Sequence, residues 1–202
     1  MKAVIIKPYS SLLWMPPSYS LYGLFFTAMS LLMNEVELKR ILQLFNDGKP
    51  PFLISSSFPL VVKDNKKVFF LPFPNIYHFK LEKLKNQNQN SQLTLEEYRK
   101  NKRFKKIKYI SSEVFFDISS GNISLQDFFN SNEWENFYDS SLGIKQVNVF
   151  HNSINRISNS VTEGLLYDTN EYFFKDGFYF LVKGDDSLIH GALNFLSDFG
   201  IG

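Results

Sequence analysis

Hydrophobic and polar positions at the start of the chain predict one strand followed by two helices. Residues 3–6 form a short β-branched run, which is typical of an opening strand. Residues 19–33 are apolar on nearly every side, so we expect a buried helix there. Asn34 is placed to cap a second helix, and Glu37 stands three positions later to complete a capping box. This second helix is expected to end at the Asp-Gly-Lys-Pro-Pro stretch of 47–51.

The next segment predicts two strands separated by a turn. Residues 52–58 and 68–73 are rich in Phe, Leu and Val, and the polar stretch 63–66 lies between them. The order strand, helix, strand, strand is that of the first half of a ferredoxin-like βαββαβ unit.

A second series of elements is predicted beyond residue 110. The expected elements are a short helix through Phe116 toward Gly121 that Ser111 or Ser112 can cap, a helix at 125–138, a strand at 145–150, a hairpin of 173–174 with 178–182, and a final helix at 187–199 that Asp185 and Asp186 cap.

The predicted fold class is α+β, with two ferredoxin-like (RRM-like) domains. Residues 1–140 are expected to form the first domain, and 141–202 a second domain that is incomplete at its C-terminus. The tract 86–92 consists of Asn, Gln and Ser, which cannot bury apolar area. We therefore expect a mobile polar and basic insertion at about 85–106.

Composition narrows the class of protein without identifying it. The net charge is only +2, so any nucleic-acid surface has to come from local clusters of cations. The chain has no Cys, which excludes disulfides and Cys-based zinc sites. No apolar run is long enough to span a bilayer, and the short apolar start resembles a signal peptide only superficially, so a cytoplasmic location is expected.

Two clusters carry candidate chemistry. A strand-like run leads directly into a segment rich in Asn, Ser and Arg, whose side chains are suited to phosphate and ribose oxygens. Arg156 is the strongest single candidate because its fork matches phosphate. The second cluster has seven cations between residues 99 and 108. The candidate RNA-binding residues are His151, Asn152, Asn155, Arg156, Ser158, Asn159, Arg99, Lys102, Arg103, Lys105 and Lys106.

Several segments together resemble one known family. The more specific segments are Pro-Pro-Phe-Leu-Ile-Ser-Ser-Ser-Phe-Pro at 50–59 and His-Asn-Ser-Ile-Asn-Arg at 151–156. The supporting segments are Lys7-Pro8, the stretch 19–24, Phe-Leu-Pro at 70–72, the basic-to-aromatic stretch 104–110, and 178–182 and 198–202 at the end of the chain. The chain resembles the fourth subunit of the type III-A (Csm) CRISPR effector complex, a member of the RAMP superfamily.

The resemblance implies a non-catalytic RNA-binding subunit in antiviral defence. It would hold the repeat-derived 5′ handle of the CRISPR RNA and bridge the large polymerase-like subunit to the backbone RAMP subunit. It would also use a thumb-like hairpin near the target RNA, with Glu163 to Tyr167 expected at its tip and Leu165, Leu166 and Tyr167 as wedge residues. Gly200 and Gly202 would begin a glycine-rich loop, although the family pattern continues beyond the last residue here. The loop 10–14 also lacks the His and Gly often seen in the family.

Simpler interpretations stay open at this point. Residues 151–159 are also compatible with an ordinary Asn/Ser-rich turn, 99–108 with a solvated basic face, and 165–167 with core filling. A metal-independent CRISPR RNA-processing endoribonuclease with His151 as general acid or base is one alternative function, and a protein-binding scaffold is another. No cofactor or metal is expected, because the three histidines His78, His151 and His190 lack ligand spacing.

Overall fold

The computed structural model describes residues 1–74, 95–138, 142–158 and 160–200 of the 202-residue chain. The described residues divide into two compact units. The first combines residues 1–58 with 144–202, and the second comprises residues 59–143. The Asn/Gln tract 86–92 lies outside the described residues.

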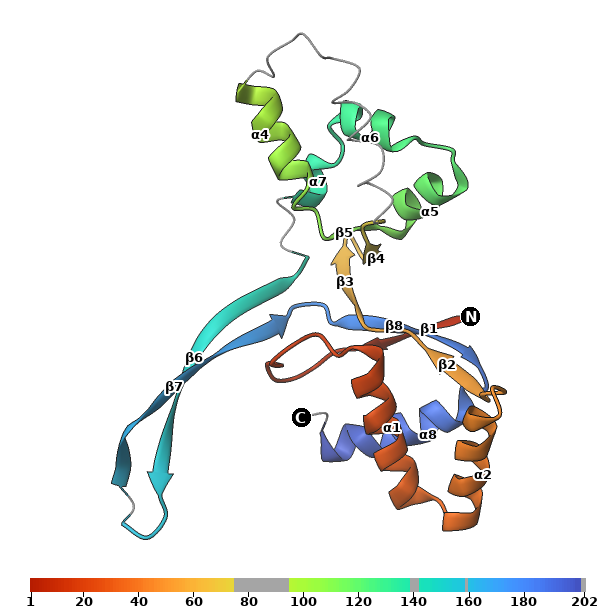
Figure 1. The fold of residues 1–202 in the computed structure, drawn as a ribbon, viewed down its shortest axis with the longest axis vertical. Helices are drawn as coiled ribbons and strands as arrows, with labels where there is room; N and C mark the ends of the chain where they lie inside the picture. Colours follow the sequence, from red (N-terminus) through yellow and green to blue (C-terminus); the bar gives the residue numbers. More distant parts are fainter. Residues whose placement is uncertain (75–94, 139–141, 159, 201–202) are drawn as a thin grey trace. The chain divides into compact units, whose positions relative to one another are not determined.

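The first unit is built around β8 (Phe178–Gly184), which pairs antiparallel with β1 (Lys2–Ile6) and with β2 (Phe52–Ile54). The helices α1 (Ser18–Leu32), α2 (Glu35–Asn46) and α8 (Ser187–Phe199) belong to the same unit, and α1 packs on α8 (Figure 1). The first and last parts of the chain therefore share one sheet.

The core of the first unit follows from the alternation along its strands. Phe180 and Val182 of β8 point toward the helices and are buried with Phe25 of α1 and Ile189 of α8. Tyr179 points to the opposite face, where its ring packs against Phe58 at 5.6 Å between centroids. Burial raises the pKa of Tyr179 to about 12, because the phenolate would have to lose its hydration.

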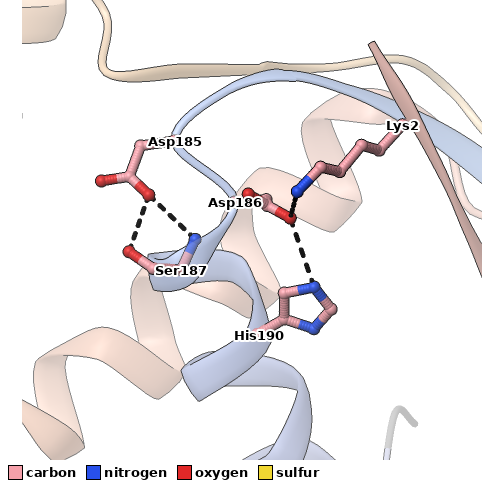
Figure 2. A network of polar contacts seen from close by, with 5 residues as sticks. All are labelled: Lys2, Asp185, Asp186, Ser187 and His190. Atoms are coloured by element: carbon pink, nitrogen blue, oxygen red, sulfur yellow. Dashed lines mark hydrogen bonds and ion pairs between the residues drawn. The ribbon is translucent and has the colours of Figure 1, made fainter.

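Polar contacts fix the start of α8 to β1 (Figure 2). Asp186 accepts a hydrogen bond from Lys2 Nζ at 2.7 Å, and His190 Nε2 lies 3.4 Å from the same carboxylate oxygen. Asp185 Oδ1 accepts hydrogen bonds from Ser187 N at 2.9 Å and Ser187 Oγ at 2.7 Å. The predicted capping role thus falls on Asp185, since the Asp186 side chain makes no capping bond.

The second unit contains a small antiparallel sheet and several helices (Figure 1). The sheet order is β3 (Phe58–Lys63), β4 (Lys66–Pro72) and β5 (Tyr109–Ser111). The described helices are α4 (Leu95–Phe104), α5 (Ser112–Ser120), α6 (Leu125–Ser131) and α7 (Glu135–Tyr138). Their core gathers Phe104, Ile110, Phe128 and Trp134, all buried.

Most predicted elements are confirmed in place and type. The Asn34 side chain accepts a hydrogen bond from Glu37 N at 2.8 Å, as the capping pattern predicted. Asp64 and Asn65 form the turn between β3 and β4 with positive φ angles of 51° and 59°, a conformation that Asp and Asn tolerate. The predicted helix at 125–138 is divided into α6 and α7 at Asn132.

One predicted pairing is wrong. β7 (Ser160–Phe174) and β8 were expected to form a hairpin through 175–177, but β7 pairs with β6 (Ile144–Asn155), whereas β8 pairs with β1 and β2. Gly177 explains the difference, because its φ of +101° lets the backbone approach Ile6 closely. A β-carbon built there would lie 2.3 Å from the Ile6 carbonyl oxygen.

The α+β class is confirmed, but a duplicated ferredoxin-like pattern is not clear. The compact units interleave along the sequence, whereas 1–140 and 141–202 were expected to be consecutive domains. The two-domain division stays a prediction. None of the described helices is both long and apolar enough to cross a membrane.

Candidate nucleic-acid interface

Strands β6 and β7 form a separate two-stranded antiparallel ribbon. They are paired from Ile144 opposite Phe174 to Asn155 opposite Ser160, with a bulge between Asn152 and Ile154. In Figure 1 the far end of this ribbon lies away from the helices of its own unit. An isolated two-stranded ribbon is only marginally stable in water, so the burial of its two faces decides what it contributes to the fold.

The two faces of the ribbon differ in burial. Directly opposite residues share a face, so Val149, His151, Tyr167, Thr169 and Glu171 lie together. Most of this face is partly buried. The other face carries Gln146, Asn148, Phe150 and Asn152 opposite Tyr172, Asn170, Asp168 and Leu166, and all of these except Tyr172 are exposed. The ribbon therefore presents a face of amides and apolar side chains, with one carboxylate, Asp168, to its surroundings.

The partly buried face holds a polar network centred on His151. The Nε2 atom of His151 lies 2.8 Å from Thr169 Oγ1 and 3.5 Å from Glu171 Oε1, and its ring stacks on Tyr167 with centroids 5.1 Å apart. Ser11 Oγ donates a hydrogen bond to the other carboxylate oxygen of Glu171. His151 is thus held by its neighbours on the ribbon.

The tip of the ribbon is the turn that follows Asn155. Arg156, Ile157 and Ser158 are exposed there, and the hydroxyl groups of Ser158 and Ser160 lie 2.8 Å apart. The side chain of Asn155 and the whole of Asn159 lie outside what the structure describes. Arg156 therefore projects from the turn where a guanidinium can reach a phosphate.

The expected position of the thumb tip is wrong. Residues 163–167 were expected there, but they lie in the middle of β7, with Leu166 opposite Asn152 and Tyr167 opposite His151. Arg156, Ile157 and Ser158 form the turn instead, and Ser favours turns. Leu166 is 64% exposed and Tyr167 56%, so neither fills the core. The side chain of Leu165 is not among those described.

The second cluster lies on α4 and just after it. Phe104 and Ile107 are buried and anchor the segment, and Lys100 Nζ lies 4.6 Å from the centroid of the Phe129 ring. The candidate cations Arg99, Lys102, Arg103, Lys105 and Lys106 are all exposed. Residues 99, 102 and 103 follow helical spacing, so they share one face of α4.

Gly200 ends α8, where its N–H donates to Leu196 O at 2.8 Å and its φ is +89°. Gly202 lies outside the described residues, so the glycine-rich loop stays a prediction. Within the described part of the chain, no three His, Cys, Asp or Glu side chains are grouped to hold a metal ion.

Sequence reasoning missed Thr169 and Glu171, which position His151, and Ser11, which contacts Glu171 from a distant loop. Period-two alternation along β7 could have placed 167, 169 and 171 on one face. The contact with Ser11 depends on the register of remote segments, and no local pattern announces it.

Known proteins resemble this chain in fold rather than in sequence. No protein-family model matches the sequence, and no curated protein matches it. Among solved structures, a chain in the crystal structure of a Csm1–Csm4 cassette in complex with cA4 matches with a TM-score of 0.65 and 22% identity, covering 98% of this chain and 66% of that one. A cassette in complex with pppApA matches with a TM-score of 0.59 and 22% identity, covering 97% of this chain and 65% of that one.

A chain of the type III-B Cmr-beta complex bound to cognate target RNA and AMPPnP matches more weakly. Its TM-score is 0.52 at 14% identity, covering 93% of this chain and 55% of that one. The described fold is therefore similar to that of chains in the Csm1–Csm4 cassettes and in the type III-B Cmr-beta complex. Of these three structures, the two cassettes have the higher TM-scores. This chain spans just under two thirds of the length of the matched cassette chains.

Proposed function

We propose that this chain is a non-catalytic, RNA-binding subunit of a type III-A CRISPR effector complex. It holds the 5′ handle of the CRISPR RNA and bridges the large polymerase-like subunit to the backbone RAMP subunit. The observation that carries the proposal is a Csm4-like fold whose separate ribbon ends in an exposed arginine, Arg156. The fold supports the proposed class of complex, and the exposed arginine on the ribbon supports the proposed RNA contact.

The RNA contacts proposed for the ribbon are to the sugar–phosphate backbone. Arg156 can donate two parallel hydrogen bonds to one phosphate, and Ser158 can donate a further one. Asn152, on the exposed face, suits a 2′-hydroxyl or the edge of an unstacked base. Asn155 and Asn159 are proposed as contacts from the sequence pattern alone.

Substitution of Arg156 tests this contact. Arg156→Ala should weaken binding of an RNA that carries the 5′ handle by about tenfold, because one charge-assisted contact is lost. It should also make the slope of log K against log salt concentration smaller by about one. Arg40→Ala removes an equally exposed arginine from α2 and serves as the control. Equal binding by both variants at moderate salt would refute the proposed contact.

The exposed face of α4 is proposed as a second, sequence-independent RNA contact. Replacing Arg99, Lys102 and Arg103 by Gln should reduce the salt slope by about two for single-stranded RNA. Lys63, Lys66 and Lys67 are exposed in the same unit, so their triple replacement by Gln makes the same change in charge elsewhere. If the cations of α4 are only solvated and do not contact RNA, both triple variants will have the same slope of log K against log salt concentration.

Leu166 and Tyr167, whose side chains point to opposite faces of the ribbon, are proposed as wedge residues that disturb pairing between guide and target. Both are exposed in β7, and the Tyr167 ring is already oriented by stacking on His151. The double replacement by Ser should leave handle binding unchanged but reduce the fluorescence of a 2-aminopurine placed at the disturbed pair, because that base would stack again.

The endoribonuclease alternative gains no support from the geometry. His151 and Arg156 are five residues apart, at most about 16 Å along an extended strand. The contacts of the His151 ring are with Thr169, Glu171 and Tyr167. The proposal expects no cleavage when repeat RNA is incubated with the purified protein. Cleavage that His151→Ala abolishes would favour the enzyme instead.

A further inference from the structure

The loop between β1 and α1 exposes aromatic side chains that are not packed in the core. Tyr9 is fully exposed, Trp14 is 58% exposed, and Leu13 between them is half exposed. Large apolar side chains gathered on one short segment usually mark a binding surface. Neither ring has a place in the RNA contacts proposed above.

This loop is fixed rather than free. Leu12 exchanges two backbone hydrogen bonds with Tyr172 of β7, with N···O distances of 3.0 and 2.7 Å. Ser11 Oγ donates to Glu171 on the same strand, and Pro16 O accepts a hydrogen bond from Ser57 N at 3.0 Å. Because much of the loop is already ordered, the rings can bind with little further loss of conformational entropy.

The charge of the segment decides the class of partner. Between Lys7 and Glu35 the sequence contains no charged residue. A nucleic-acid backbone needs several cations to replace its counterions, and the loop between β1 and α1 offers one, Lys7. Cores of protein–protein interfaces are instead depleted in charge and enriched in Tyr, Trp and Met. The surface therefore fits another protein.

We propose that Tyr9 and Trp14 anchor this chain in an uncharged, apolar pocket of the large polymerase-like subunit. This inference rests on the proposed function, and the similar Csm1–Csm4 pairs are described as cassettes of two proteins. Aromatic anchors at the centre of an interface carry a disproportionate share of its binding energy. The contact with β7 would then couple docking to the position of the ribbon.

The test is the affinity of the full chain for the large subunit, measured in the absence of RNA. The double variant Tyr9→Ser/Trp14→Ser should bind about 30-fold more weakly or worse. Tyr98→Ser/Phe116→Ser removes two similarly exposed rings from α4 and α5 and should bind like the wild type. Ser11→Ala keeps both anchors but loosens the loop, and should weaken binding a few-fold.

The remaining outcomes are separable. If Tyr9→Ser/Trp14→Ser binds the large subunit as tightly as the wild type and has the same unfolding midpoint, the proposed anchoring role of the two rings is wrong, while the proposed function is unaffected. If the variant loses RNA binding but keeps the large subunit, the rings stack on bases and the proposal is wrong. If the wild-type chain does not bind the large subunit at all, the proposed function fails together with the anchor.

Discussion

The sheet of the first unit and the ribbon β6–β7 are both antiparallel, yet they use their apolar side chains in opposite ways. In the sheet, Phe180 is fully buried beneath α1 and α8. On the ribbon, Phe150 is 70% exposed and Ile157 at the tip 98%. Burial on this scale stabilises the fold, whereas exposed rings on a ribbon contribute little until something covers them. The comparison assigns stability to the sheet and leaves the exposed side chains of the ribbon for the recognition proposed above.

The largest effect should come from truncating the same side chain in the two places. Phe180→Ala leaves a cavity in the core and should lower the free energy of unfolding by about 3–5 kcal/mol. Phe150→Ala should change it by less than about 0.5 kcal/mol. Chemical denaturation measures both values. Similar losses for the two variants would show that the ribbon is part of the stabilising core.

A smaller but still clear effect is expected at the glycine that redirects the chain from the ribbon into the sheet. Gly177→Ala places a β-carbon against the Ile6 carbonyl and should cost about 3 kcal/mol or more. Gly121 also has a positive φ, of +82°, but open space around its β-carbon position. Gly121→Ala should therefore cost only about 1 kcal/mol. Thermal unfolding measures both losses of stability. If Gly177→Ala and Gly121→Ala destabilise the protein equally, the backbone near Ile6 can move to accommodate a β-carbon.

The sheet of the first unit and the ribbon also show what the sequence could and could not predict. The strand β8, the turn at 175–177 and the helix α8 were all predicted from local patterns. The pairing of β8 was not, because β1 is its partner from the other end of the chain and no local signal encodes that contact. The polar segment 151–159 was recognised as a candidate site, but its division between a strand and a turn depends on the register with β7.

An intermediate effect is expected at the cap of α2. Asn34→Ala removes the acceptor for Glu37 N and should lower the free energy of unfolding by about 1 kcal/mol. Asn34→Asp keeps an acceptor at that position, so it should restore most of the loss. A loss that Asp does not restore would mean that the side chain acts through some contact other than capping.

The smallest effect concerns the acidic start of α8. The hydrogen bond from Lys2 lowers the pKa of Asp186, and the hydrogen bond from the Ser187 hydroxyl lowers that of Asp185. A lowered pKa in the folded state means that the stabilisation is present above the unfolded pKa and lost as pH falls through the folded value. The loss should therefore occur below about pH 4.

Thermal unfolding of the wild type and Asp186→Asn at pH 7 and at pH 3 isolates this contribution. The wild type should be slightly more stable at pH 7, and the difference should shrink at pH 3. A difference that stays constant between the two pH values would show that the carboxylate charge is not what Lys2 stabilises.

The most direct measurement of the central claim is photocrosslinking of CRISPR RNA to the assembled complex, followed by mass spectrometry of the peptides from this chain. The account predicts that the 5′ handle crosslinks to the peptide containing His151 to Ser160. Handle crosslinks confined to other parts of the chain, with this peptide recovered unmodified, would contradict it.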